Sequence, residues 1–363
     1  MLRCEFFSAI GILYSQLLSL ANQEGNLMKV MRLKDNSEGL ASLYCADEAE
    51  PTVVGNDEIK VRIHASSLNY HDYSVATGAI PTEGDRIPMS DGAGVVVEVG
   101  EGVTQFAPGD HVVSTFFPDW LSGAPTVGDF SRTPGDGIDG YAREVVVKPQ
   151  RWFTKAPSGW SHEEAATITT AGLTAWRALV VEGGLKAGDT VLLLGTGGVS
   201  IYALQIAKAM GAKVAITSSS DEKLEKAKAL GADFTVNYNT DEKWGKTVAK
   251  WTGGKGVDHV VEVGGPATLG QSIHACRVGG SIILIGVLTG IKGDIPTATL
   301  MRKQIRLTGV IVGSNKDQWD FVSALECMNF KPVVDTTFAL ERLSDAFAFE
   351  ESGKHFGKIC VSI

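Results

Sequence analysis

Three glycines near the middle of the chain could hold a phosphate group. They lie in TVLLLGTGGVSIYALQIAKAMG (190–211), after an apolar run and before a helical pattern. In such a turn the first glycine permits the reversal, the second lets the backbone approach a pyrophosphate, and the helix start offers free N–H groups. Ser200 replaces the third glycine of the common pattern. An ordinary loop is the alternative. The predicted pyrophosphate contacts are Gly195, Thr196, Gly197, Gly198 and Val199.

The next predicted strand, Lys213 to Thr217, carries information about the ribose. An NAD-preferring site usually places Asp or Glu at the end of this strand, about 20 residues after the first glycine. This chain has Thr217, Ser218 and Ser219 there, with Lys223 following. Hydroxyls and an ammonium suit a 2′-phosphate, which a carboxylate would repel. We therefore expect NADP(H), bound through Ser218, Ser219 and Lys223. The serines also suit a helix N-cap, and both roles can hold together.

Composition limits the remaining possibilities. The chain has 363 residues, 44% hydrophobic and 21% charged, enough for two ordinary domains with a substantial core. A formal net charge of −9 argues against nucleic acid as a partner. The five cysteines form no C-x-x-C pair, which favours a reducing, cytoplasmic compartment over a disulfide framework. They are Cys4, Cys45, Cys276, Cys327 and Cys360.

The first 27 residues read as an N-terminal extension. Their apolar stretch, Phe6 to Leu20, is interrupted by polar residues and glycine, and is too short and too polar for a membrane span. A secretory signal peptide is the alternative, weakened by Glu5 in what would be the basic region. Ordinary domain sequence begins at Met28.

The remaining chain shows two kinds of pattern. Residues 28–160 hold short alternating strands between Gly, Pro and Asp turns, which predicts a β-barrel-like domain. Residues 161–314 begin with a helix, His162 to Gly184, and then alternate strands with helices, which predicts a doubly wound parallel sheet. Residues 315–363 are expected to return to the first domain. The later strands are expected at 191–194, 213–217, 234–237, 259–262, 281–285 and 304–312, and the helices at 199–210, 221–230, 243–252, 267–275 and 318–328.

This order of parts resembles the medium-chain dehydrogenase/reductase superfamily. The resemblance rests on GYAREVVV, TTAGLTAW, LLLGTGGVS, VDHVVEVGG, GGSIILIG and FGKICVSI, and it runs from about Met28 to Ile363. It implies a GroES-like catalytic domain, a Rossmann domain and hydride transfer from a nicotinamide held between them. It also implies a homodimer joined at the sheet edge near 281–287 and 304–312.

The superfamily includes zinc-dependent and zinc-free members, so the ligand positions decide the branch. By resemblance those positions are Asn69, Ser90 with the following Asp91, and Thr170. A zinc site requires thiolate, imidazole or carboxylate at each protein position, which this set does not supply. The cysteines of the structural-zinc lobe are also missing. We therefore expect no metal, and the chain looks like the quinone oxidoreductase branch.

Without zinc, reduction of a quinone or an activated C=C bond needs the least electrophilic help. The hydride adds to the β-carbon of an enone, and the charge spreads onto an oxygen that one hydrogen-bond donor can stabilise. We expect NADPH-dependent reduction of a small electrophile of this class. Two alternatives stay open: an NADP(H)-binding protein with a structural or regulatory role, and a metal-free alcohol dehydrogenase.

The resemblance also suggests roles for individual residues. Asn69 would be an amide donor beside the nicotinamide. Tyr70, His71 or Tyr73 could deliver a proton, with Asp72 in a structural role; ordinary core packing is the alternative for all four. Thr170 and Thr174 would contact the nicotinamide unless they serve helix packing. The remaining expected cofactor contacts are Tyr238, Gly264, Gly286, Val287, Val312 and Lys358.

Two of these assignments have specific alternatives. Lys358 could instead be a solvated charge. An aromatic loop, Phe116, Phe117 and Trp120, could wall the substrate pocket or could only support its own loop.

Overall fold

The computed structural model describes residues 26–34 and 36–363. The predicted extension, its signal-peptide alternative and Cys4 therefore lie outside the described residues, apart from the last two residues of the extension. Leu27 already belongs to β1 (Leu27–Leu33), which pairs antiparallel with β2 (Leu43–Ala49). No helix in the described part of the chain is long and apolar enough to cross a membrane.

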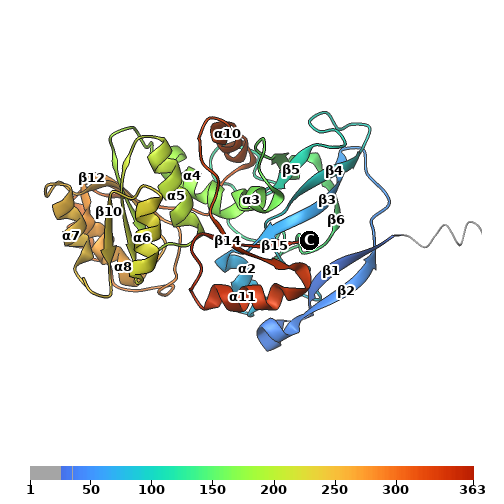
Figure 1. Ribbon diagram of the computed structural model, residues 1–363, viewed down its shortest axis with the longest axis horizontal. Helices are drawn as coiled ribbons and strands as arrows, with labels where there is room; N and C mark the ends of the chain where they lie inside the picture. Colours follow the sequence, from blue (N-terminus) through green and yellow to red (C-terminus); the bar gives the residue numbers. More distant parts are fainter. Residues whose placement is uncertain (1–25, 35) are drawn as a thin grey trace, which may run out of the picture.

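One half of the molecule is built on a six-stranded parallel sheet (Figure 1). The strand order is β10-β9-β8-β11-β12-β13. Numbered from β8, this is the 3-2-1-4-5-6 order of a doubly wound dinucleotide-binding sheet, so the predicted fold class is confirmed. The strands are β8 (Thr190–Leu194), β9 (Lys213–Ser218), β10 (Phe234–Asn237), β11 (Val257–Glu262), β12 (Cys276–Leu284) and β13 (Arg306–Gly309).

Helices cover both faces of this sheet because its central strands are apolar on both sides. In β8, Val191 and Leu193 join the core that includes α5, while Leu192 and Leu194 join the core beneath α7 and α8. The helices are α5 (Gly198–Ala209), α6 (Asp221–Ala229), α7 (Trp244–Trp251), α8 (Pro266–Ala275) and α9 (Thr297–Arg302).

The other half is organised around a mostly antiparallel sheet of order β14-β15-β3-β4-β5-β7, with β6 also paired to β3. Gly94 in β4 lies so close to β3 that a Cβ on it would stand 2.0 Å from the carbonyl oxygen of Arg62. The strands are β3 (Glu58–Ser67), β4 (Ala93–Val99), β5 (His111–Ser114), β6 (Val145–Pro149), β7 (Phe153–Lys155), β14 (Val334–Ala339) and β15 (Lys358–Ser362).

The C-terminal segment returns to this second sheet, and Figure 1 shows β14, β15 and α11 beside β3 and α2. On the way, the N–H of Gly357 donates to the carbonyl of Thr196 in the glycine turn at 3.0 Å. The two sheets are thus tied together at the turn predicted to bind pyrophosphate. The helices of this half are α2 (Tyr70–Ala76), α10 (Asn315–Leu325) and α11 (Leu343–Glu351), with short 3-10 turns at Asn36–Ser42, Gln150–Trp152 and Leu340–Arg342.

Several predicted bounds differ from the structure, two of them in kind or by more than half of the element. The helix expected over 162–184 is a series of α3 (His162–Ala166), α4 (Leu173–Trp176) and two π-helical turns, Ile168–Gly172 and Arg177–Val181. The strand expected over 304–312 is only β13, and the residues at its two expected ends, Gln304 and Val312, have φ angles of 51° and 44°, outside the strand region. The domain limits at residues 160 and 314 stay a prediction.

Candidate active site

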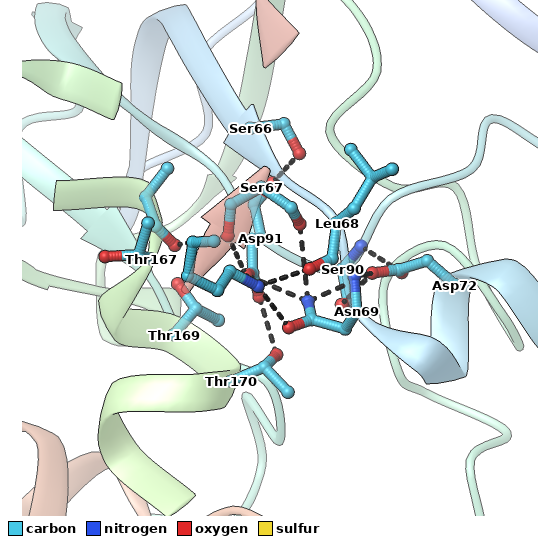
Figure 2. Close-up of polar contacts among 12 residues, drawn as sticks. Ser66, Ser67, Leu68, Asn69, Asp72, Ser90, Asp91, Thr167, Thr169 and Thr170 are labelled. Atoms are coloured by element: carbon cyan, nitrogen blue, oxygen red, sulfur yellow. Dashed lines mark hydrogen bonds and ion pairs between the residues drawn. The ribbon is translucent and has the colours of Figure 1, made fainter. Parts of the chain in front are cut away.

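A buried polar cluster forms where three chain segments meet (Figure 2). The end of β3 leads through Ser67 and Leu68 to Asn69, which precedes α2. The loop before β4 contributes Ser90 and Asp91, and the π-helical turn 168–172 contributes Thr170. Such widened turns often occur at functional sites. The cluster therefore unites the three positions that the resemblance assigns to metal ligation, Asn69, Ser90 and Thr170, with Asp91, although they lie up to about a hundred residues apart.

Asn69 is fully engaged within this cluster. Its Nδ2 donates to Asp72 Oδ2 at 3.0 Å and to Asp91 Oδ2 at 2.9 Å, and its Oδ1 accepts from Lys358 Nζ at 2.7 Å. The side chain is 8% exposed. Because two buried carboxylates accept its amide hydrogens, Asn69 orients its neighbours in this structure rather than offering a free donor.

Asp91 is the acceptor on which the cluster converges. Its carboxylate accepts from Thr170 Oγ1 at 2.6 Å and from Ser67 Oγ at 2.5 Å, in addition to Asn69. Complete burial raises the pKa of Asp91 to about 6, and the nearby Lys358 opposes this rise. Thr170 is the half-buried member of the group and lies nearest to solvent.

Asp72 accepts hydrogen bonds from two segments of the cluster. It accepts from the backbone N–H of Asn69 at 3.1 Å and from the N–H of Ser90 at 2.8 Å, so it joins α2 to the loop before β4. Burial raises the pKa of Asp72, while the neighbouring His71 and these hydrogen bonds oppose the rise. Asp72 is the third residue of α2, where a carboxylate can reach back to the N–H of the residue that precedes the helix.

The three predicted proton donors point elsewhere. Tyr70 is 53% exposed. His71 Nε2 lies 3.2 Å from Asp136 Oδ2, and its ring packs on Phe130. Tyr73 faces Glu351 on α11, and burial followed by that contact raises the Tyr73 pKa to about 12. Consecutive helix residues are spread around the axis, so α2 directs only Asp72 into the cluster. Tyr73 meets Asn69 through a backbone hydrogen bond of helix α2, at 3.1 Å, and the roles of Tyr70, His71 and Tyr73 as proton donors stay a prediction.

Lys358 is not a solvated charge. It is 3% exposed, and its ammonium donates to the carbonyl of Leu68 and to Asn69 Oδ1. Asp91 Oδ2 lies 3.9 Å away. The lysine connects the polar cluster with the glycine turn, because a Cβ on Gly198 would stand 2.5 Å from Lys358 Cδ.

The glycine turn has the expected local geometry. Gly195 has φ +71°, a conformation that favours glycine, and Gly197 precedes α5 with open space where its side chain would be. Ser200 Oγ donates to the carbonyl of Leu194 at 2.7 Å, which accounts for a small polar residue at the third position of the pattern. The N–H groups at the start of α5 are thus available to an anion.

The residues predicted to hold the 2′-phosphate gather at the end of β9. Ser218 is buried and its Oγ accepts from the N–H of Ser220, which caps α6. Lys223 Nζ donates to the carbonyl of Gly353 at 2.5 Å, and burial lowers its pKa. Tyr238 is 40% exposed beside them, with its N–H bonded to the carbonyl of Ser218 at 3.1 Å. Ser219 accepts from the side chain of Asn237 through its carbonyl.

Glu262 is a site residue that the sequence reasoning missed. It is completely buried at the end of β11 and accepts from the N–H groups of Gly264 at 2.8 Å and Gly265 at 3.0 Å. Thr268 Oγ1 donates to the same oxygen at 2.6 Å, and Ser272 Oγ donates to the other oxygen. The glutamate thereby shapes the turn that carries Gly264. The only sequence signal was an acidic residue ending an apolar strand directly before two glycines.

Three of the remaining predicted cofactor contacts, Gly286, Val287 and Val312, follow the neighbouring strands β12 and β13. Gly286 lies just after β12 and close to the residue that follows β11: a Cβ on Gly286 would stand 2.2 Å from the carbonyl oxygen of Val263. The next residue, Val287, is 48% exposed. Val312 is buried, and its carbonyl accepts from Arg177, a second residue that the sequence reasoning missed. Thr174 is buried in α4.

The aromatic loop is closely packed. Phe116, Phe117 and Trp120 are at most 5% exposed, and the two phenylalanine rings meet edge to face at 4.8 Å. The Arg177 guanidinium lies 4.8 Å from the centre of the Trp120 ring. These contacts support the loop; its contribution to a substrate pocket stays a prediction.

The residues at the zinc-ligand positions do not fit zinc. The hydroxyl hydrogens of Ser90 and Thr170 and the amide hydrogens of Asn69 are donated to Asp72 and Asp91, and an ammonium adjoins them. Zinc requires lone pairs directed at one point from thiolate, imidazole or carboxylate. Among the described residues, no group of three or more His, Cys, Asp or Glu could hold a metal ion.

Known proteins resemble the chain along most of its length. The GroES-like alcohol dehydrogenase domain matches residues 55–158, and the zinc-binding dehydrogenase domain matches residues 198–328. A zinc-type alcohol dehydrogenase-like protein of Schizosaccharomyces pombe is 39% identical over 91% of this chain and 97% of its own length. An acryloyl-coenzyme A reductase of Sulfurisphaera tokodaii is 26% identical over 88% of this chain and 96% of its own length.

A solved structure agrees with this relationship. The crystal structure of an NAD-dependent alcohol dehydrogenase is 35% identical, covers 92% of this chain and 99% of its own chain, and superposes with a TM-score of 0.83. The chain therefore belongs to the medium-chain dehydrogenase/reductase family.

Proposed function

We propose that the protein is an NADPH-dependent reductase of quinones or of C=C bonds conjugated to a carbonyl group, working without a metal. The observation that carries this proposal is the cluster at the metal-ligand positions. It consists of an amide, hydroxyls and an ammonium, mutually hydrogen-bonded around two buried carboxylates. Such a cluster offers polar contacts to an oxygen but no Lewis acid. Conjugated acceptors need less polarisation than a simple ketone.

When bound, the nicotinamide would supply a hydride. The roles left to the protein are to hold the cofactor at the glycine turn and to stabilise charge on the acceptor oxygen. Thr170 suits the second role because its hydroxyl is the half-buried edge of the cluster. Its single hydroxyl hydrogen is donated to Asp91 at 2.6 Å in the free protein and would turn from Asp91 to the acceptor oxygen. Asn69, Asp72 and Asp91 would keep the Thr170 side chain at this edge of the cluster.

The names of the relatives support a reductase of conjugated double bonds alongside alcohol dehydrogenases. They include the acryloyl-coenzyme A reductase above and a 2-octenoyl-CoA carboxylase reductase crystallised with NADP and 2-octenoyl-CoA, which is 25% identical with a TM-score of 0.81. The alternatives are a metal-free alcohol dehydrogenase and an NADP(H)-binding protein without turnover. Each predicts a different outcome in one assay.

The test is oxidation of NADPH and of NADH by purified protein against a quinone, an enone and an enoyl thioester, with and without a chelator. Chelator-resistant oxidation of NADPH supports the proposal. Zinc-dependent turnover contradicts it, alcohol-dependent reduction of NADP favours the dehydrogenase alternative, and tight NADPH binding without turnover favours the binding protein.

We further propose that Lys223 distinguishes NADPH from NADH. Replacing it with alanine should raise the KM for NADPH about ten- to a hundredfold, since a hydrogen bond to a charged group contributes about 1.5–3 kcal/mol. The KM for NADH should stay nearly unchanged. Lys226→Ala is the matched control, because Lys226 lies on the same helix but pairs with Glu222 at the surface. Equal effects of Lys223→Ala on both cofactors would refute the assignment.

A homodimer joined along β13 is also part of this proposal. β13 is the terminal strand of the six-stranded sheet, and exposed apolar side chains surround it. Unpaired strand edges with apolar surroundings favour association. The exposed residues are Val278 at 60%, Val287 at 48%, Leu288 at 53%, Ile291 at 87%, Met301 at 75% and Ile311 at 50%.

We place the protein in the cytoplasm. The four described cysteines, Cys45, Cys276, Cys327 and Cys360, are free thiols, and two of them are buried. Cysteines that form no disulfide bond among the described residues suit a reducing compartment.

A further inference from the structure

Lys358 reaches the polar cluster along a path that the fold builds for it. Its predecessor Gly357 has φ +84° and donates its N–H to Thr196 at 3.0 Å, so β15 starts at the glycine turn. The lysine stem then passes the first residue of α5, where only a glycine leaves room, because a Cβ on Gly198 would lie 2.5 Å from Lys358 Cδ. The ammonium therefore arrives in the cluster from the side of the cofactor-binding half.

The ammonium directly contacts one of the three metal-ligand positions, Asn69. It donates to the carbonyl of Leu68 and to Asn69 Oδ1, and it lies 3.9 Å from Asp91 Oδ2. An amide whose oxygen faces a cation must turn its NH₂ group away from it, here toward Asp72 and Asp91. Asp91 in turn holds Thr170. A chain of oriented groups thus begins at the lysine and ends at the half-buried hydroxyl.

The charges in the cluster require such a cation. Asp72 is 2% exposed and Asp91 is completely buried, and buried carboxylates need a compensating partner. Among the described ion pairs, the one that reaches Asp91 comes from Lys358. With the lysine in place, its ammonium occupies the position beside Asn69 Oδ1, the oxygen atom that a metal ion would need as a ligand.

We propose that the Lys358 ammonium is the resident cation of this site, taking the place of the metal of zinc-binding dehydrogenases and fixing Asn69, Asp91 and, through them, Thr170. Lys358 is then a positioning residue and not a direct cofactor contact. This inference rests on the proposed function for one readout only, the measurement of kcat.

The first test compares Lys358→Met with Lys358→Arg in the full chain. Methionine keeps an unbranched stem without charge, and arginine keeps the charge. The Met variant should lose kcat about a hundredfold, as when an oriented donor is removed, while its Kd for NADPH changes by less than about threefold. The Arg variant should recover part of the kcat. A large rise in Kd with an unchanged kcat would overturn the inference, because it would make Lys358 a cofactor contact.

The second test is rescue by an amine and needs no substrate. Ethylammonium chloride should raise the melting temperature of Lys358→Ala in a saturable way, whereas tetramethylammonium chloride at equal ionic strength should not. Lys331→Ala is the matched control: its lysine also donates to a carbonyl, Gly159 at 2.6 Å, and to a side-chain oxygen, Glu164 at 2.8 Å, but at the surface. The control should show no ethylammonium effect.

Metal analysis completes the design and separates the two proposals. Wild-type protein dialysed against zinc should retain no stoichiometric metal. Stoichiometric zinc in the wild-type protein that Lys358→Ala loses would overturn the role of Lys358. Equal effects of ethylammonium on Lys358→Ala and Lys331→Ala would overturn it as well. If the wild type reduced none of the electrophiles, the proposed function would fail, but the melting temperatures, NADPH binding and zinc content would still decide this inference. If Lys358→Ala did not fold, the Met and Arg pair would decide it through the melting temperature and the Kd.

Discussion

Replacing Glu262 with leucine is expected to destabilise the protein by about 4 kcal/mol, because the N–H groups of two glycines lose a buried acceptor at about 1–3 kcal/mol each and two hydroxyls lose theirs. Leucine is no smaller than glutamate, so the expected loss does not come from a cavity. The melting temperature should fall by roughly 10 °C. Differential scanning fluorimetry of the purified variants measures this change.

Glu262→Gln is the matched control. Its amide oxygen can still accept from Gly264, Gly265 and Thr268, and its NH₂ group can donate to Ser272, whose hydroxyl can reverse its role. We expect it to cost no more than about 1–2 kcal/mol. If leucine and glutamine had equal effects, the hydrogen bonds to Glu262 would not be what shapes this turn.

Replacing Gly197 with alanine should raise the Kd for NADPH about a hundredfold, which corresponds to about 2.7 kcal/mol, while leaving the melting temperature of the free protein unchanged. A Cβ at this position meets nothing within 4 Å, and φ is −79°, so the fold accepts the methyl group. The bound pyrophosphate would not, because the backbone must approach it closely. Fluorescence titration with NADPH measures the effect.

Gly128→Ala is the control, since a Cβ there also meets nothing within 4 Å and lies far along the chain from the turn. It should bind NADPH like the wild type. Gly198→Ala is expected to differ from Gly197→Ala by lowering the melting temperature as well, because its methyl group would collide with the Lys358 stem. An unchanged Kd for NADPH in Gly197→Ala would contradict the prediction that this turn binds the pyrophosphate.

The nucleotide-binding half could be predicted closely because its signals are local. The apolar run 191–194 ends at Gly195 and misses one residue of β8, and the expected 234–237 coincides with β10. The expected helix 199–210 is α5 shifted by one residue. Periodicity and turn chemistry act within a dozen residues, and the chain shows them directly. The strand 304–312 was too long because its end is decided by left-handed residues, which no apolar pattern reveals.

The sequence by itself thus determined the fold class, the glycine turn and the unsuitability of the metal-ligand positions for zinc, since each depends on residue types or local spacing. Only the tertiary structure decided that Asn69 turns its amide toward two aspartates, and that α2 sends Asp72 inward while Tyr70, His71 and Tyr73 point elsewhere. It also decided that Lys358 is buried against Asn69, 289 residues away. The physical reason is that hydrogen-bond direction and burial depend on how β15, α2 and the π-helical turn pack together, and residues so distant in sequence carry no local sign of that meeting.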